Sequence, residues 1–168
     1  SIGIYSYELF SMYGVETIIR VGSAGSYVAD LDVYDVVLAE SAYSESNYAK
    51  TQNGCEDDIM YPSKEVNERI IAAAEKLDIP CKVARIHSSD VFYQDANRGS
   101  YTRYPENHGA MCVEMESFAL FHNANVLGKK AACILTISDC FVSKKETTAE
   151  ERQNAFTAMM KIALEAAE

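Results

Sequence analysis

The sequence predicts an α/β fold in which one β-sheet is covered by helices on both faces. Segments with helical periodicity alternate with strand-like segments, and each strand-like segment is a nearly continuous run of apolar residues. Such runs are typical of strands that are buried on both faces of a sheet. The 168 residues are enough for one domain with a substantial core, and no repeat, linker or low-complexity segment divides them.

Helices are predicted where apolar residues recur at helical spacing between start and stop signals. Gly14 ends the first helix, Ser63 is a candidate N-cap of the second, and Gly128 follows the third. Thr148 and Glu151 have the spacing of a capping box, so we expect the last helix to begin there and to continue to the end of the chain. The expected helices cover residues 2–13, 63–77, 117–128 and 148–168.

Strands are predicted from apolar runs that are bounded by turn residues. They cover residues 16–26, 34–43, 81–89 and 129–139. The polar stretch 46–58 is expected to be a long loop, and residues 94–109 are expected to be rich in turns. Residues 113–116 stay open, because Glu114 and Glu116 lie on the same side of an extended segment but diverge if a helix has already begun.

Composition and charge argue against several classes of function. The net charge is −10 without a block of lysine or arginine, so neither nucleic acid nor an anionic membrane surface is expected as a partner. No run is long enough to span a bilayer and none reads as a secretory signal, which favours a cytoplasmic location. The five cysteines form no C-x-x-C motif and the three histidines lie far apart, so we expect neither a disulfide nor a metal site.

Ligands of such folds gather at the carboxyl ends of the strands, and the first candidate site lies in "IIRVGSAGS". Gly22 and Gly25 allow a sharp turn there, while Ser23 supplies a hydroxyl group and Arg20 a cation. These groups suit the binding of an anion. The alternative is an ordinary glycine turn, although an arginine within a buried strand needs an acceptor.

Two further strand ends carry candidate residues. Phe92, in "HSSDVFYQ", follows a strand and could either stack on a planar ligand or belong to the core. Ser138 and Asp139 end the last strand, where the ordinary role is to cap a turn. Alternatively, partial burial would let the carboxyl group of Asp139 hold a proton near neutral pH and donate it to a leaving group.

Arg152 lies at the head of the apolar stripe of the last helix, in line with Phe156 and Met159. An arginine on an inward face and in the first turn of a helix is disfavoured twice, which calls for a carboxylate partner. We expect that partner to be Asp139. The alternative is an arginine that snorkels at the rim of the protein.

Five segments, "RVGSAG", "SSDVFY", "VEMES", "TISD" and "ETTAEERQNAF", follow an order and spacing that resemble the nucleoside phosphorylase and nucleosidase superfamily. Within it, the chain is most similar to the hexameric purine nucleoside phosphorylases, essentially over its whole length. The resemblance implies a phosphorylase-type three-layer fold, with a mixed central sheet flanked by helices on both faces. It also implies an enzyme, a pentosyltransferase of purine salvage. Such an enzyme reversibly converts purine ribo- or deoxyribonucleosides and phosphate into free base and pentose 1-phosphate.

The resemblance further implies a role for each candidate residue. It assigns Arg20 and Ser23 to phosphate. It assigns Asp139 to the general acid at purine N7, supported by Ser138 and paired with Arg152. The nucleoside-binding residues that it implies are Phe92 and Val113 beside the purine, Met115 and Glu116 at the ribose, and Glu114 close by.

The implied partners are a purine nucleoside, inorganic phosphate and further copies of the chain, in a homohexamer built as a trimer of dimers. No metal or organic cofactor is implied, since phosphate is the co-substrate. In this family a segment that precedes the present Ser1 supplies the first strands and part of the phosphate site. We therefore expect residues 1–168 to form a single phosphorylase-like domain without those amino-terminal strands.

Two other functions stay open on the sequence. A hydrolytic purine nucleosidase, of the methylthioadenosine or adenosylhomocysteine type, would use water in place of phosphate, but Arg20 and Arg152 favour phosphate. A non-catalytic nucleoside-binding member of the same fold is the second alternative. Uridine phosphorolysis is disfavoured, because Ser138 and Asp139 suit a purine. The sequence does not separate 6-oxo from 6-amino purines.

Overall fold

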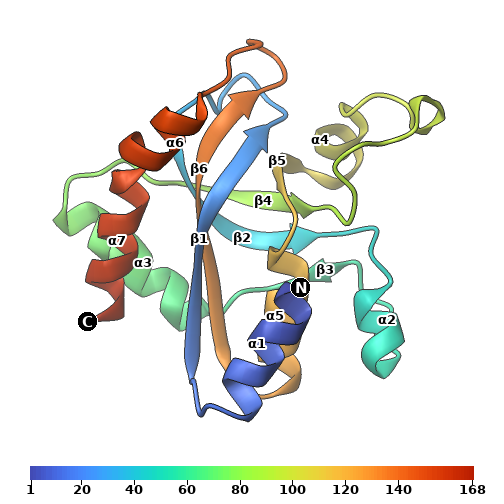
Figure 1. The fold of residues 1–168 in the computed structure, drawn as a ribbon, viewed down its shortest axis with the longest axis vertical. Coiled ribbons are helices and arrows are strands. Elements are labelled where there is room, and N and C mark those ends of the chain that lie inside the picture. The colour runs from blue at the N-terminus through green and yellow to red at the C-terminus, as the bar shows by residue number, and fades with distance from the viewer.

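The computed structural model describes residues 1–168, and its strands form one mixed sheet in the order β3-β2-β4-β5-β1-β6. Strands β1 and β6 run parallel, as do β2 and β4 and also β4 and β5, whereas β5 is antiparallel to β1. Strand β6 also pairs with β2, so the sheet curls and closes on itself (Figure 1). The strands are β1 (Thr17–Ser26), β2 (Val36–Tyr43), β3 (Ile59–Met60), β4 (Lys82–Ser88), β5 (Ala110–Glu114) and β6 (Lys130–Cys140).

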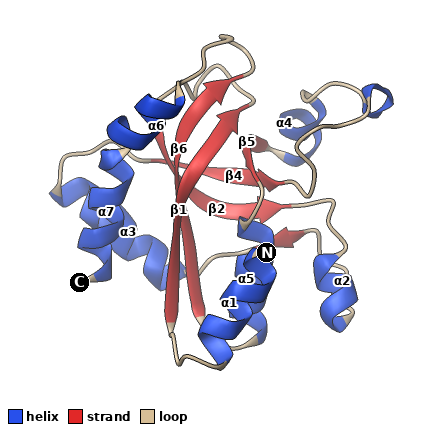
Figure 2. Cartoon of the chain, viewed as in Figure 1, coloured by secondary structure: helices blue, strands red, loops and turns tan.

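Helices cover both faces of this sheet (Figure 2). Helices α1 and α5 pack together on one side, and α3 and α7 pack together on the other. The helices are α1 (Ile2–Ser11), α2 (Tyr48–Asn53), α3 (Lys64–Lys76), α4 (Arg103–His108), α5 (Ser117–Val126), α6 (Ala149–Ala155) and α7 (Thr157–Ala167), with a short 3-10 helix η1 (Ala96–Arg98). The α/β fold with a mixed central sheet is thus confirmed. None of these helices has the length and hydropathy needed to cross a bilayer.

Strand β6 shows why its sequence is a continuous apolar run. Cys133 and Leu135 belong to the core cluster under α1 and α5, while Ala132 and Ile134 belong to the cluster under α3 and α7. Successive side chains point to opposite faces of a strand, so a strand with a core on both faces needs apolar residues at every position. The two clusters contain 19 and 13 buried residues, and they hold the sheet between the two helical layers.

Two segments expected to lack regular structure contain short helices, so those expectations are wrong. Residues 46–58 contain α2, which Gly54 ends in the left-handed conformation at φ 81°. The hydroxyl of Tyr48 donates to Asn123 Oδ1 at 3.0 Å, which ties α2 to α5. Residues 94–109 contain η1 and α4. Helices of three to six residues are too short to show a repeating apolar face.

The helix expected to run unbroken over residues 148–168 is instead two helices. The capping box of Thr148 and Glu151 is confirmed, and it begins α6. Phe156, at φ −85° and ψ 33°, separates α6 from α7. Helix α6 buries none of its residues, whereas α7 buries Met159 and Ile162 against the sheet. Packing therefore fixes the direction of α7 only, and the chain bends where that packing begins.

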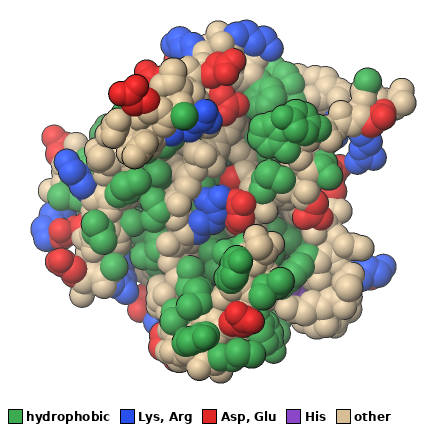
Figure 3. All heavy atoms as spheres, viewed as in Figure 1, with side chains coloured by type: hydrophobic (Ala, Val, Ile, Leu, Met, Phe, Trp, Pro, Cys, Tyr) green, Lys and Arg blue, Asp and Glu red, His purple; other side chains and the backbone are tan.

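Apolar side chains also gather on the surface, over α1 on the face shown in Figure 3. Ile4, Tyr5, Met12 and Tyr13 are among the exposed residues of this segment. A group of exposed apolar side chains is typical of a surface that meets another molecule.

Candidate active site

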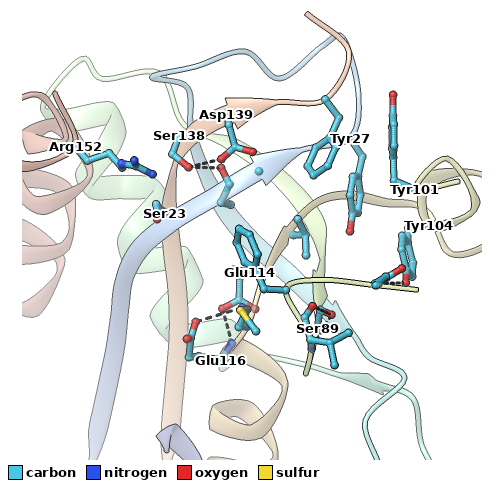
Figure 4. Close-up of a pocket in the computed structure, with 18 of the residues that line it drawn as sticks. Ser23, Tyr27, Ser89, Tyr101, Tyr104, Glu114, Glu116, Ser138, Asp139 and Arg152 are labelled. Carbon is cyan, nitrogen blue, oxygen red and sulfur yellow. Dashed lines mark hydrogen bonds between the residues drawn. The ribbon is translucent and has the colours of Figure 1, made fainter. Parts of the chain in front are cut away.

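A single cavity of about 620 Å³ is lined by all ten residues that the sequence singled out. They are Arg20, Ser23, Phe92, Val113, Glu114, Met115, Glu116, Ser138, Asp139 and Arg152. Gly25 of β1 pairs with Val113 of β5 on one side and with Asp139 of β6 on the other. This pairing brings residues that are distant in the sequence to one end of the sheet (Figure 4).

Asp139 is held at this end by an irregularity in strand pairing. The register passes from the pair Ala24–Ile137 to the pair Gly25–Asp139, so Ser138 is an extra residue in β6. Such a bulge redirects the neighbouring side chains. The Ser138 hydroxyl donates to Asp139 Oδ1 at 2.7 Å, and the carboxyl group is only partly buried. The structure thus presents an oriented, accessible carboxyl group to the cavity.

Gly25 lies so close to this carboxyl group that a larger residue would displace it. A Cβ atom at Gly25 would lie 2.9 Å from Asp139 Oδ2 and 3.0 Å from Phe141 Cε2. We expect Gly25→Ala to lower kcat by about 10- to 100-fold through misplacement of Asp139. Steady-state kinetics would measure this, with circular dichroism as the control for folding. Full activity in a folded Gly25→Ala protein would show that the position of Asp139 is not critical.

The opposite side of the cavity holds Arg20 between two glutamates. Arg20 Nε lies 3.3 Å from Glu114 Oε2, and Arg20 Nη2 forms an ion pair with Glu116. Strand β5 stays extended as far as Glu114 and α5 begins only at Ser117. The question that the sequence left open is therefore answered: the chain is extended through Glu114 and bends at residues 115–116 before α5 begins, and one guanidinium group still reaches both carboxylates.

The two glutamates differ in how many hydrogen bonds their carboxylates accept from the protein. Glu114 is buried, and its carboxylate accepts hydrogen bonds from the backbone N–H groups of Glu116 and Ser117. Burial raises the pKa of Glu114, against the lowering effect of Arg20 and of these hydrogen bonds. The side chain of Glu116 is 37% exposed, so its carboxylate can also accept from a ligand. Glu114 supports the start of α5, and Glu116 is the better candidate for ligand contact.

One donor of Arg20 has no partner. The Nη1 atom is buried and makes no hydrogen bond. It occupies the space that the Cβ atom of any other residue at position 22 would need, so only glycine fits there. A Cβ atom at Gly22 would be 1.9 Å from Nη1. A buried guanidinium donor without an acceptor is costly, so this atom is suited to an anion that enters beside Ser23.

The structure corrects the expected position of Arg152 and decides between the two alternatives for Phe92. Arg152 is exposed, and no ion pair within 4.0 Å joins it to Asp139, although both residues line the cavity. The expectation that Arg152 faces inward is wrong because it lies on α6, the helix without buried residues. Figure 4 shows Arg152 beyond Ser138, with its guanidinium group directed towards the site. Phe92 is 77% exposed, so it lies at the mouth of the cavity and is not packed in the core.

Four aromatic residues that the sequence reasoning missed also line the cavity. They are Tyr27, Tyr101, Tyr104 and Phe141, and we call them the aromatic wall. The sharp turn expected at Gly22 and Gly25 is wrong, because both glycines lie within β1 and pair with β6. Tyr27 directly follows the end of β1, and Phe141 stands two residues after Asp139, so position relative to the strand ends could have identified both. Tyr101 and Tyr104 carry no such signal, because they reach the cavity from the segment that contains α4.

His87 supports the aromatic wall from behind. Its Nδ1 atom lies 2.8 Å from the Tyr27 hydroxyl, and its ring stacks on Tyr104 with a centroid distance of 3.8 Å. Burial lowers the pKa of His87 from 6.5 to about 4. Between pH 4 and pH 6.5, His87 therefore binds more protons in the unfolded chain than in the folded protein.

We expect acidification from pH 6.5 towards pH 4 to remove up to about 3 kcal/mol of folding stability through this histidine. This contribution is fully present above pH 6.5, since the folded-state pKa is the depressed one. Urea unfolding at a series of pH values would measure it. The decline should be smaller in His87→Gln, which does not titrate. An equal decline in both proteins would mean that His87 is not responsible.

No group of three or more His, Cys, Asp or Glu side chains is arranged to hold a metal ion. The polar side chains that line the cavity include Arg20, Glu116, Ser138 and Asp139, and the aromatic wall lines it as well. The arrangement can bind an anion, accept hydrogen bonds from hydroxyl groups and donate a proton at a point next to an aromatic surface.

Comparison with known proteins agrees with this geometry. The model of the phosphorylase superfamily matches residues 1–168. A protein named purine nucleoside phosphorylase DeoD-type from Mycoplasma genitalium is 40% identical over 98% of this chain and 69% of its own length. One of the same name from Clostridium perfringens is 41% identical over 99% of this chain and 70% of its own.

The solved structure of a futalosine hydrolase mutant from Helicobacter pylori has the same fold. Its TM-score is 0.80, with 20% identity, over 98% of this chain and 73% of that one. The resemblance expected from the five sequence segments is confirmed by the family match over the full chain. This chain belongs to the phosphorylase superfamily.

Proposed function

We propose that this protein catalyses the reversible phosphorolysis of purine nucleosides. In this reaction the bond between C1′ and N9 breaks, a phosphate oxygen bonds to C1′, and the base leaves with a proton at N7. The products are the free purine and ribose or deoxyribose 1-phosphate. The relatives with about 40% identity carry the name of this activity, which supports the proposal.

The observation that carries the proposal is that Arg20, whose buried Nη1 has no hydrogen-bond partner, lines the same cavity as Asp139. The first group offers a buried donor to phosphate, beside Ser23. The second offers an acid to the leaving purine, with its orientation set by Ser138. The hydroxyl groups of the sugar would lie between them, where Glu116 can accept their hydrogen bonds and Met115 forms an apolar wall.

These positions suit the charges that develop as the glycosidic bond breaks. Positive charge grows on the sugar, where phosphate stabilises it and attacks C1′. Negative charge grows on the base, where the proton of Asp139 neutralises it at N7. Arg152 is part of the proposal as the partner of Asp139, although it lies outside ion-pairing distance in this structure. Phe92 and Val113 would contact the purine ring.

Hydrolysis is the second candidate, because a protein with the same fold is named a hydrolase. That likeness concerns the fold alone at 20% identity. Water carries no negative charge, so a hydrolase needs no cationic donor to hold its nucleophile. Arg20 Nη1 therefore favours phosphorolysis.

A cleavage assay with inosine, adenosine, guanosine and uridine, each with and without inorganic phosphate, tests the proposal. We expect purine nucleosides to be cleaved only when phosphate is present, and uridine to be left intact. Cleavage that is indifferent to phosphate would favour the hydrolase. No cleavage of any nucleoside, together with tight nucleoside binding, would favour a non-catalytic binding protein.

The proposal includes assembly of several copies, with a hexamer expected. The exposed apolar side chains on α1 and directly after it support the assembly, because Ile4, Tyr5, Met12 and Tyr13 would be covered by another subunit. Light scattering coupled to size exclusion would give the mass in solution. A species that stays at 18.6 kDa across concentrations would contradict the expected assembly.

A further inference from the structure

The aromatic wall is a continuous surface of rings at one end of the cavity (Figure 4). Tyr27 stacks nearly parallel with Tyr101 and with Tyr104, at centroid distances of 5.7 Å and 5.4 Å. Phe141 leans against Tyr27 at 5.4 Å and against Tyr101 at 5.0 Å. Rings at these separations contact one another, so the wall is a packed unit and not four independent side chains.

The hydroxyl groups of the two buried tyrosines are already used behind the wall. The Tyr27 hydroxyl lies 2.8 Å from His87 Nδ1. The Tyr104 hydroxyl accepts from Gln94 Nε2 at 2.8 Å and donates to Glu45 Oε2 at 3.1 Å. Tyr27 and Tyr104 are buried beneath the wall, so its open surface is that of the half-buried rings of Tyr101 and Phe141. Phe141 has no polar atom and offers only carbon surface to a ligand.

This carbon surface begins next to the proposed acid. A Cβ atom built on Gly25 would lie 2.9 Å from Asp139 Oδ2 and 3.0 Å from Phe141 Cε2, so these two side chains lie close to each other above Gly25. Figure 4 shows Asp139 between Arg152 on one side and the tyrosines on the other. A base held by Asp139 would therefore have the aromatic wall as its neighbour on the side away from Arg152.

The structure of a purine determines which of its atoms would face the aromatic wall. N7 and the substituent at C6 lie on the same edge of a purine. If Asp139 holds N7, the group at C6 projects next to Asp139 and towards Phe141, and Tyr101 lies behind Phe141 at a centroid distance of 5.0 Å. Phe141 and Tyr101 carry no charge, so they form no ion pair with a 6-amino or 6-oxo group. A carbon substituent on the 6-amino nitrogen would therefore displace no such contact.

We propose that this site accepts purine nucleosides that carry an aromatic group on the exocyclic 6-amino nitrogen, with that group packed against Tyr101 and Phe141, the half-buried rings of the wall. The inference rests on the proposed function, since it requires Asp139 to hold N7. The reaction balances as it does for adenosine: phosphate takes the pentose, and the N6-substituted adenine leaves with a proton at N7.

The test compares N6-benzyladenosine with adenosine in the presence of inorganic phosphate. The kcat/KM for N6-benzyladenosine should stay within about tenfold of that for adenosine, because the benzyl group gains contact with the wall. In Tyr101→Ala, kcat/KM for N6-benzyladenosine should fall about tenfold, while that for adenosine changes by less than about twofold. Tyr101→Phe should behave as the parent protein, since it keeps the ring.

Tyr61→Ala is the matched control, because Tyr61 is exposed and lies outside the cavity. It should change neither activity. Cleavage of adenosine together with a loss of more than about 100-fold on N6-benzyladenosine would overturn the inference and leave the proposed function intact. Equal losses on both substrates in Tyr101→Ala would also overturn it. Failure to cleave either nucleoside would contradict the proposed function and the inference that rests on it.

Calorimetry with the free bases gives a second measurement that does not need turnover. N6-benzyladenine should bind at least as tightly as adenine, and Tyr101→Ala should weaken only the binding of N6-benzyladenine, by about tenfold. Tighter binding of adenine than of N6-benzyladenine would count against the wall as a substituent site.

Discussion

Asp139→Asn is expected to lower kcat for purine nucleosides by about 10²- to 10⁴-fold, the range that a general acid contributes. Asparagine has the shape of aspartate and can keep the hydrogen bond from Ser138, which the carboxylate accepts at 2.7 Å. It cannot deliver a proton to N7. The KM for phosphate should change little, because Arg20 and Ser23 lie apart from the substituted group. Steady-state kinetics with each substrate varied in turn would measure both quantities.

Asp57→Asn provides the control for this variant, since Asp57 is exposed and lines no part of the cavity. It should retain the activity of the parent protein. If Asp139→Asn kept full turnover on an adenine nucleoside, Asp139 would have no part in the departure of the base. If both variants lost activity together, the loss would have to be attributed to folding.

Arg20→Ala is expected to lower the free energy of unfolding by about 3–5 kcal/mol, the cost of breaking a buried ion pair from one side. The reason is Glu114, which is buried and has Arg20 as its cationic partner. The variant should also raise the KM for phosphate, because the unpartnered Nη1 is lost. Urea denaturation measures the first effect, and kinetics at saturating nucleoside measures the second.

A second substitution separates stability from phosphate binding. In Arg20→Ala with Glu114→Gln, the uncompensated charge is removed, so at least about 1 kcal/mol of stability should return. The KM for phosphate should remain high. Arg98→Ala is the control, because Arg98 makes an exposed ion pair with Glu45 and its loss should cost less than about 1 kcal/mol. A stable Arg20→Ala protein with an unchanged KM for phosphate would contradict both roles of Arg20.

The sequence predicted the site better than it predicted the segments around it. Arg20, Ser138 and Asp139 stand at the ends of apolar runs, and the carboxyl ends of neighbouring strands must meet at one edge of a sheet. The apolar stripe of the last helix pointed to Arg152, and the motif order added the glutamates of "VEMES". Every one of these residues lines the cavity: strand pairing brings β1, β5 and β6 together, and Arg152 reaches the cavity from α6.

What the sequence could not predict depends on tertiary packing. Tyr101 and Tyr104 come from a turn-rich segment, and only their packing against Tyr27 brings them to the cavity. The break at Phe156 follows from the burial of α7 but not of α6, which no local pattern records. That break is also why Arg152 stands exposed at the rim, where an unbroken amphipathic helix would have turned it inward.

The structure distinguishes Glu114 from Glu116, which the sequence motif alone does not. By sequence the two residues are nearly equivalent acids in an apolar run. In the structure one of them accepts the backbone N–H groups at the start of α5, and the other keeps an exposed carboxylate. The assignment of Glu116 to the sugar thus rests on its access to the cavity as well as on the motif.

The central claim, that the pentose is transferred to phosphate, is tested most directly by phosphorus NMR of a reaction with adenosine or inosine. The account predicts that a pentose 1-phosphate resonance grows as orthophosphate disappears, in amounts equal to the free purine released. Free purine that accumulates with no change in the orthophosphate signal would contradict the account and assign the cleavage to water.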